Sequence, residues 1–212
     1  MTLRCGLLLL AALAWAPARA SDEGDPAPPE AAAPPDRAEY VRLGQELEQL
    51  AARNAWAGVE RTYYRLRQTG IPLKFEHHFA GVQAARALGN VYAARKRLAA
   101  AHALREEKQV IDWMFEIDSR YGRVTLACEP GRQRVELTAE AMPFQPDMRR
   151  AVEFAMGRVS EACAFDGLLP RGRYAFGGHA FTVEGVQAVT IDLRHMEPLD
   201  RRDRRRRRKG AG

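Results

Sequence analysis

The chain has 212 residues, of which 46% are hydrophobic and 28% are charged, and its net charge at pH 7 is +6. The last thirteen residues hold eight basic and two acidic side chains, so they account for the whole excess. Because the remainder of the chain is neutral, this composition excludes a folded basic domain that binds nucleic acid through its surface charge.

The first twenty residues have the features of a cleavable secretory signal. Arg4 precedes an apolar run from Gly6 to Trp15, and Ala18 and Ala20 supply the small residues of a cleavage site. An apolar run this short does not span a bilayer unaided, so we expect no transmembrane helix in the mature chain. The expected location is secreted or periplasmic, in a bacterial envelope.

Residues 21–36, SDEGDPAPPEAAAPPD, are acidic, rich in Pro and Ala, and without large apolar side chains. Such a segment cannot bury enough apolar surface to offset the entropy lost on ordering. It therefore predicts a disordered tether.

Residues 37–122 are rich in Ala, Leu, Arg and Glu and poor in Gly and Pro, which predicts a helical domain. Asn54 separates the first two expected helices, and Gly70 with Pro72 closes the second. A helix over about 107–121 is expected to cover the end of the stack. The side chains expected in the core are Tyr40, Leu43, Leu47, Leu50, Ala51, Trp56, Val59, Tyr63 and Leu66, and later Val110, Trp113, Met114, Ile117 and Tyr121.

A shift of 35 residues nearly repeats this apolar pattern. The segments TGIPL (69–73) and GNVYAARKRLAAA (89–101) resemble the tetratricopeptide repeat family. The resemblance implies antiparallel helical hairpins whose concave face holds a peptide or a partner protein. The alternative is a helical-hairpin stack of another kind. The repeated apolar positions are Val82, Ala85, Val91, Ala94, Leu98 and Ala101.

Residues 123–195 change to a period of two and predict a small β-sheet module with one inserted helix, so the predicted fold class is α+β. A first hairpin is expected to turn at Pro130 and Gly131, and a second at Gly177 and Gly178. The inserted helix is expected to begin at Pro146. The inward side chains are Val124, Leu126, Cys128, Val135, Leu137 and Ala139 in the first hairpin, Met148, Val152, Ala155, Met156, Val159 and Cys163 in the helix, and Tyr174, Phe176, Phe181, Val183, Val189, Ile191 and Leu193 after it.

The segment LLPRGRYAFGGHAFTV is similar to PEGA-type and carboxypeptidase-regulatory-like modules of bacterial surface proteins. Pro170, Gly172 and Tyr174 carry the likeness, since in those modules a proline, a glycine and an aromatic residue lead into an edge strand. The resemblance implies a non-enzymatic surface module.

Signal cleavage removes Cys5 and leaves Cys128 and Cys163, both on predicted buried faces. In an oxidising compartment this pair favours a disulfide, which contributes about 2–4 kcal/mol. The alternative is two buried free thiols. A catalytic thiol is not expected, because neither position is exposed or electropositive.

The sequence contains no recognisable catalytic or metal-binding pattern, so we expect neither an enzyme nor a cofactor. No serine lies in a G-x-S-x-G motif. His77 and His78 are adjacent on an expected helix and point about 100° apart, which does not make a two-histidine metal face. The remaining histidines, His102, His179 and His195, are isolated in the sequence.

Residues 196–212 are expected to form a disordered basic tail. An exported chain rarely meets nucleic acid, so the expected partners of the tail are anionic membrane surfaces or acidic polysaccharide. Each basic side chain near an anionic bilayer contributes roughly 1 kcal/mol. The alternative is a solvated terminus that binds nothing. The candidate anion-binding residues are Arg201, Arg202, Arg204, Arg205, Arg206, Arg207, Arg208 and Lys209.

These features predict an exported, non-enzymatic adaptor that binds a protein or peptide through its helical repeats. The alternative is an accessory or inhibitory domain that binds one enzyme through the β module. A hydrolase with an unfamiliar site is a third hypothesis.

Overall fold

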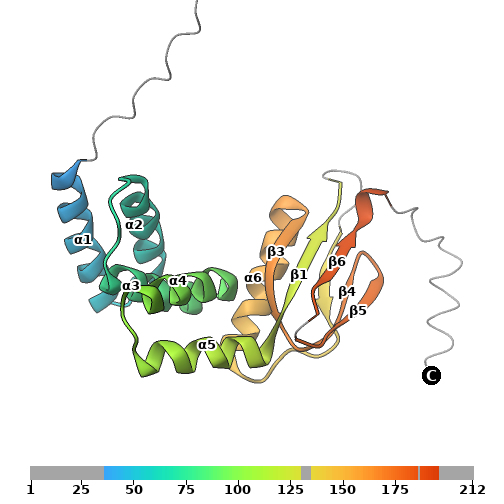
Figure 1. Cartoon of the computed structure of the whole chain (residues 1–212). Coiled ribbons are helices and arrows are strands. Elements are labelled where there is room, and N and C mark those ends of the chain that lie inside the picture. The colour runs from blue at the N-terminus through green and yellow to red at the C-terminus, as the bar shows by residue number, and fades with distance from the viewer. Residues whose placement is uncertain (1–35, 130–134, 186, 196–212) are drawn as a thin grey trace, which may run out of the picture. The chain divides into compact units, whose positions relative to one another are not determined.

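The computed structural model describes residues 36–129, 135–185 and 187–195, which belong to one compact unit. Five helices are followed by two three-stranded sheets and a sixth helix, so the α+β fold class is confirmed (Figure 1). The predicted signal, the tether up to residue 35, the turn at Pro130 and Gly131, and the basic tail lie outside the described residues.

The first five helices form a stack in which each helix packs against the next and α1 also contacts α3. The Asp36 carboxylate starts α1 by accepting hydrogen bonds from two free backbone N–H groups of its first turn. Asn54, in the turn between α1 and α2, adopts the left-handed conformation with φ 55°, which Asn tolerates better than most residues. The helices are α1 Arg37–Ala52, α2 Trp56–Gln68, α3 Phe75–Ala87, α4 Val91–Leu104 and α5 Lys108–Arg120.

The predicted apolar faces of these helices are confirmed as their core. Leu47 in α1 and Val82 in α3, which the sequence repeat aligns, are both fully buried. Five of the predicted core side chains are only partly buried against this core, namely Leu50, Ala51, Trp56, Trp113 and Met114. The other fully buried side chains of this stack include Val59, Leu66, Ala85, Ala94, Leu98, Ala101 and Val110.

The predicted hairpin between the first two strands is wrong. Strand β1 (Tyr121–Ala127) pairs with β3 (Ala164–Pro170) on one side and with β6 (Val189–Asp192) on the other. Both edges of β1 are therefore occupied, and β2 (Leu137–Ala139) pairs with β4 (Gly172–Phe176) in the second sheet. Alternation correctly identified the buried faces, but a period of two does not specify the partner strand.

The second predicted hairpin is confirmed, since β4 pairs antiparallel with β5 (His179–Val183). The resemblance placed an edge strand after Pro170, whereas β4 is the middle strand of the described sheet. Strand β3 was not predicted, because a short apolar run bounded by Cys163 and Pro170 has no alternating pattern. Leu193 falls in a short 3-10 helix that follows β6, Leu193–His195, and packs against the core.

Helix α6 (Pro146–Ala162) covers the sheets and also joins them to the helical stack. Its residues Val152, Ala155 and Val159 pack into the core formed by both sheets. On the other side, Ala151 packs with α4, α5 and Tyr121. Gly89 at the turn between α3 and α4 lies so close to α6 that an added Cβ would overlap the carbonyl oxygen of Arg150. The helices and the sheets therefore meet in a continuous packed interface.

Candidate functional site

The predicted cysteine pair is joined in the structure as a disulfide, with the Cα atoms 5.2 Å apart. Cys128 follows β1 and is buried, and Cys163 ends α6 in the left-handed conformation with φ 52°. The Cys128 N–H donates to the Cys163 carbonyl at 2.8 Å, which continues the pairing of β1 with β3. The disulfide therefore ties the end of α6 to the first sheet and is structural. The predicted anion-binding arginines lie outside the described residues.

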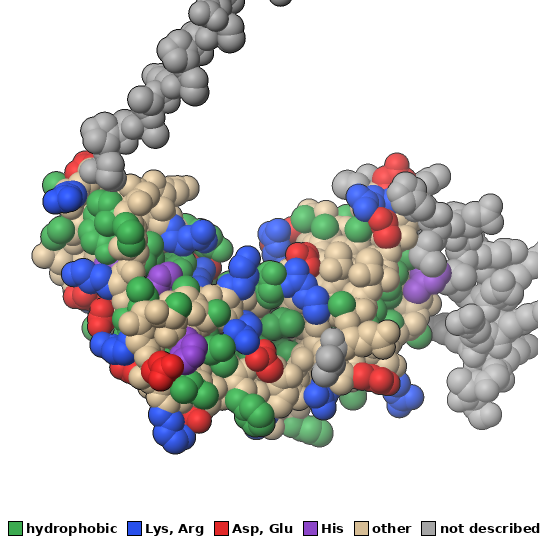
Figure 2. Space-filling view, in the orientation of Figure 1, with side chains coloured by type: hydrophobic (Ala, Val, Ile, Leu, Met, Phe, Trp, Pro, Cys, Tyr) green, Lys and Arg blue, Asp and Glu red, His purple; other side chains and the backbone are tan. Residues whose placement is uncertain are grey.

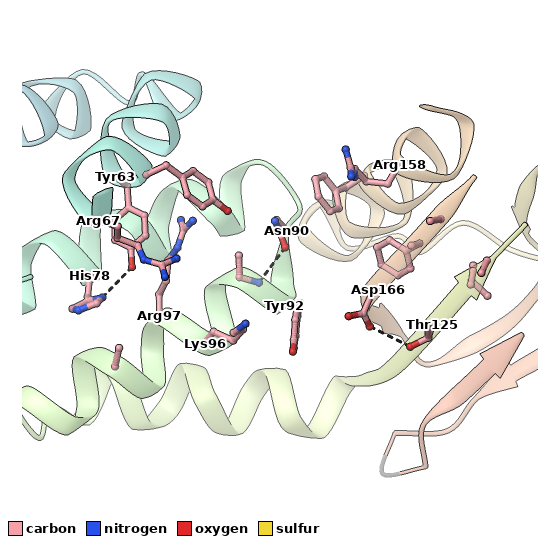
Figure 3. A pocket seen from close by; sticks show the side chains of 18 residues that line it. Tyr63, Arg67, His78, Asn90, Tyr92, Lys96, Arg97, Thr125, Arg158 and Asp166 are labelled. Carbon is pink, nitrogen blue, oxygen red and sulfur yellow. Dashed lines mark hydrogen bonds between the residues drawn. The ribbon is translucent and has the colours of Figure 1, made fainter. Parts of the chain in front are cut away.

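A cavity of about 890 Å³ lies where the helical stack meets the first sheet, and sequence analysis did not identify it. Helices α2, α3 and α4 supply one side, and β1, β3 and α6 supply the other (Figure 3). Figure 2 shows this hollow on the surface, with Lys and Arg side chains gathered around it. Its lining is rich in aromatic residues, namely Tyr63, Tyr64, Tyr92, Phe154 and Phe165. It also contains four basic residues, Arg67, Lys96, Arg97 and Arg158.

Arg97 lines the cavity, is buried, and is held by three hydrogen bonds and an aromatic ring. Its guanidinium donates to both carboxylate oxygens of Glu60, at 2.6 and 2.7 Å, and to the Gly81 carbonyl at 2.6 Å. It also stacks 4.1 Å from the centre of the Tyr63 ring. Gly81 makes this approach feasible, since an added Cβ would lie 2.7 Å from the Tyr63 ring. Arg97 therefore neutralises Glu60 and positions Tyr63, and its charge is not available to a ligand.

Tyr63 and His78 form a hydrogen-bonded pair at one end of the cavity, with 3.1 Å between the Tyr63 hydroxyl and Nδ1 of His78 (Figure 3). Burial, together with the nearby His77 and the positive charge of Arg67, lowers the pKa of His78 below its usual value. Burial also raises the pKa of Tyr63. Both side chains are therefore predominantly neutral at pH 7, and this end of the cavity gains no charge from them.

Asp166 is the acidic residue of the described lining, and Arg123 compensates its charge. Arg123 forms an ion pair with Asp166 at 2.6 Å and stacks 3.7 Å from the centre of the Tyr92 ring. The Thr125 hydroxyl donates to the same carboxylate at 3.1 Å. These contacts connect α4 to the sheet, and the positive charge of Arg123 balances the negative charge of Asp166.

Three basic side chains of the cavity remain without a strong acidic partner. Among the described residues Arg67 and Lys96 form no ion pair, although Lys96 lies 5.1 Å from the Tyr92 ring. Arg158 approaches Glu161 at 3.5 Å, but both side chains are exposed, and such a pair contributes little. The cavity therefore presents a net positive charge beside aromatic rings.

This arrangement is suited to binding an anionic group and to packing against apolar or planar groups. The described lining contains no Ser or Cys that would act as a nucleophile. Within residues 36–129, 135–185 and 187–195, no three His, Cys, Asp or Glu side chains lie close enough together to hold a metal ion. No helix in the described part of the chain combines the length and apolar composition needed to cross a bilayer.

Sequence reasoning missed this cavity because its lining comes from segments far apart in the sequence, and its basic residues Arg67, Lys96 and Arg158 belong to faces that are typical of solvated helix surfaces. Two short segments contained a usable signal, YYRLR at 63–67 and VYAARKR at 91–97, in which tyrosines precede basic residues within about one helical turn. Their convergence depends on the packing of α2 against α3 and α4. Comparisons of the chain with protein-family models, with curated proteins and with solved structures give no significant match.

Proposed function

We propose that this chain is an exported, non-enzymatic adaptor that holds a protein or peptide partner in the cavity between its helical stack and its first sheet. The observation that carries the proposal is the lining of this cavity, which combines five aromatic rings with Arg67 and Lys96, two basic side chains that form no ion pair with a described carboxylate. Aromatic residues and Arg are enriched at the centres of protein interfaces. Binding is favoured over catalysis because the described lining has no Ser or Cys nucleophile, and its acidic residue, Asp166, is held by Arg123 and Thr125.

Position-specific photo-crosslinking tests this proposal. A photoreactive residue at Tyr64, which lines the cavity and is 45% exposed, is compared with one at Val41, which is 56% exposed on α1 and does not line it. We expect a discrete adduct of defined mass from position 64 in envelope fractions. The same adducts from both positions, or none from position 64, would contradict the proposal.

The basic tail has a separate part in the proposal, which is retention at an anionic surface. Removing residues 201–212 is expected to abolish salt-sensitive binding to vesicles that contain anionic lipid, while the crosslink from position 64 persists. If the shortened chain binds the vesicles as well as the full chain does, the tail does not have this role.

A second candidate is an accessory or inhibitory domain that binds one enzyme through the α+β part. It is favoured by the loop before α6, where Phe144 is 96% exposed and Met142 is 37% exposed. Replacing Phe144 by Ser would abolish binding to that enzyme and leave the crosslink from position 64 unchanged. Retention of the enzyme by the Phe144→Ser variant would exclude this loop as the contact.

A further inference from the structure

Strand β3 is an edge of its sheet, since among the described strands it pairs only with β1. Two backbone hydrogen bonds define which of its groups point outward. The Cys128 N–H donates to the Cys163 carbonyl, and the Arg171 N–H donates to the Arg120 carbonyl. Both are pairs of the same antiparallel register, so every second pair between them exchanges hydrogen bonds.

This parity assigns Phe165, Gly167 and Leu169 to bonding with β1. The backbone N–H and C=O groups of Ala164, Asp166 and Leu168 point away from β1. Leu168 is partly buried against the core of the helical stack, whereas Ala164 and Asp166 are exposed and line the cavity. The open part of this edge therefore faces the cavity.

An open strand edge is a template for an extended peptide, because unpaired backbone groups accept another strand. The open stretch here is short, so backbone pairing alone would not select a partner. The side chains around this strand edge must therefore select the partner. Asp166 does not repel an acidic ligand, since Arg123 compensates its charge at 2.6 Å. Arg67, Lys96 and Arg158 supply positive charge to the same cavity.

We propose that the partner segment is an extended acidic peptide that pairs with the backbone of Ala164 and Asp166 and places its carboxylates against Lys96 and Arg158. Tyr92 and Phe154 flank this edge within the lining and would pack against the side chains between the carboxylates. This inference rests on the proposed function and names the chemistry of the partner. It favours a peptide over an acidic polysaccharide, because a sugar chain cannot form the alternating N–H and C=O bonds of a strand.

Fluorescence anisotropy with the labelled peptide VEVEVE tests the inference, using the full chain and a chain ending at Asp200. We expect binding that Lys96→Gln or Arg158→Gln weakens about threefold to tenfold each. Lys108→Gln, which removes an exposed lysine of α5 outside the cavity, is the matched control and is expected to change nothing. The peptide KVKVKV is expected not to bind.

N-methylation of the peptide backbone tests the strand pairing separately. Methyl groups on one alternate set of residues should reduce binding at least tenfold, while methyl groups on the other set should leave it unchanged. Equal effects of both sets, or binding unaffected by Lys96→Gln and Arg158→Gln, would overturn the inference. Binding that is seen with the full chain and lost in the chain ending at Asp200 would also overturn it and would indicate contact with the basic tail.

A soluble polyuronate that binds more tightly than VEVEVE and loses affinity in the same two variants would indicate a polysaccharide site and overturn the peptide assignment. A crosslink from position 64 that persists when VEVEVE fails to bind would refute this inference alone. Loss of both would refute the proposed function as well.

Discussion

Glu60→Leu is expected to destabilise the fold strongly, because it leaves the buried Arg97 guanidinium without its carboxylate. The Arg97 side chain is 6% exposed and that of Glu60 is 17% exposed, so water cannot fully replace the lost partner. Removing one member of such a pair costs about 3–5 kcal/mol. We expect about 3 kcal/mol here, since the Gly81 carbonyl still accepts one hydrogen bond from Arg97.

Arg97→Met should cost less, about 2 kcal/mol, because Glu60 is nearer to solvent and only the Gly81 carbonyl is left buried without its donor. The double variant Glu60→Leu/Arg97→Met leaves no unpaired charge, so we expect a total loss of only about 2 kcal/mol. The coupling between the two positions would then be about 3 kcal/mol, which is far from additive.

Urea unfolding followed by tryptophan fluorescence measures these losses, since Trp56, the first residue of α2, packs partly buried against the core. With a slope of about 2 kcal/mol per molar urea, a loss of 3 kcal/mol lowers the midpoint by about 1.5 M. Additivity of the two single variants to within about 0.5 kcal/mol would refute the assignment of a coupled ion pair at this site.

Three further expectations concern packing, the disulfide and pH. Gly89→Ala should lower the unfolding free energy by more than about 2 kcal/mol, since its φ of 80° and its contact with α6 exclude a side chain. Gly157→Ala is the control: this glycine lies in a helix with open space around it, so the change should raise the unfolding free energy by about 0.5–1 kcal/mol. Equal effects of the two changes in chemical unfolding would disprove the close approach of Gly89 to α6. Replacing Cys128 and Cys163 together by Ser should lower the unfolding free energy by about 3–4 kcal/mol. A reductant should destabilise the wild type and leave the double variant unchanged. Full thiol labelling of chains isolated from the envelope would show that the disulfide does not form there. Burial lowers the pKa of His78 in the folded protein below its ordinary value of 6.5, so protonation of this side chain favours the unfolded state. Stability should therefore decrease as the pH falls below about 6.5, and it should decrease less in His78→Gln than in the wild type. Parallel pH curves for the two proteins would contradict the lowered pKa.

The elements that could be predicted from the sequence are those whose signal is local. The core of the helical stack followed from apolar residues at helical spacing, and Leu47, Val82 and Leu98 are buried as expected. The second hairpin followed from its two glycines, Gly177 and Gly178, which both adopt positive φ. In each case neighbouring residues in the chain contain the whole pattern.

The pairing of β1 could not be predicted, because strand partners are chosen by tertiary packing. Alternating residues identify the buried face of β1 correctly. Its two partner strands, β3 and β6, lie far from it along the sequence, because β2 and α6 come before β3, and β4 and β5 come before β6. The two cysteines were different, since only one pair remains after the predicted signal cleavage, and the structure brings that pair together.

The sequence alone therefore determined the fold class and the helical core, because hydrophobic periodicity is a property of the chain itself; the choice of cysteines depended in addition on the predicted removal of Cys5. The tertiary structure decided which strands pair and where the cavity lies. Its lining residues come from α2, α3, α4, β1, α6 and β3, and their polar side chains surround one cavity only when the helical stack packs against the sheet. The tertiary structure also decided which basic side chains are paired with a carboxylate, since Arg97 lies against Glu60 whereas Lys96 has no such partner.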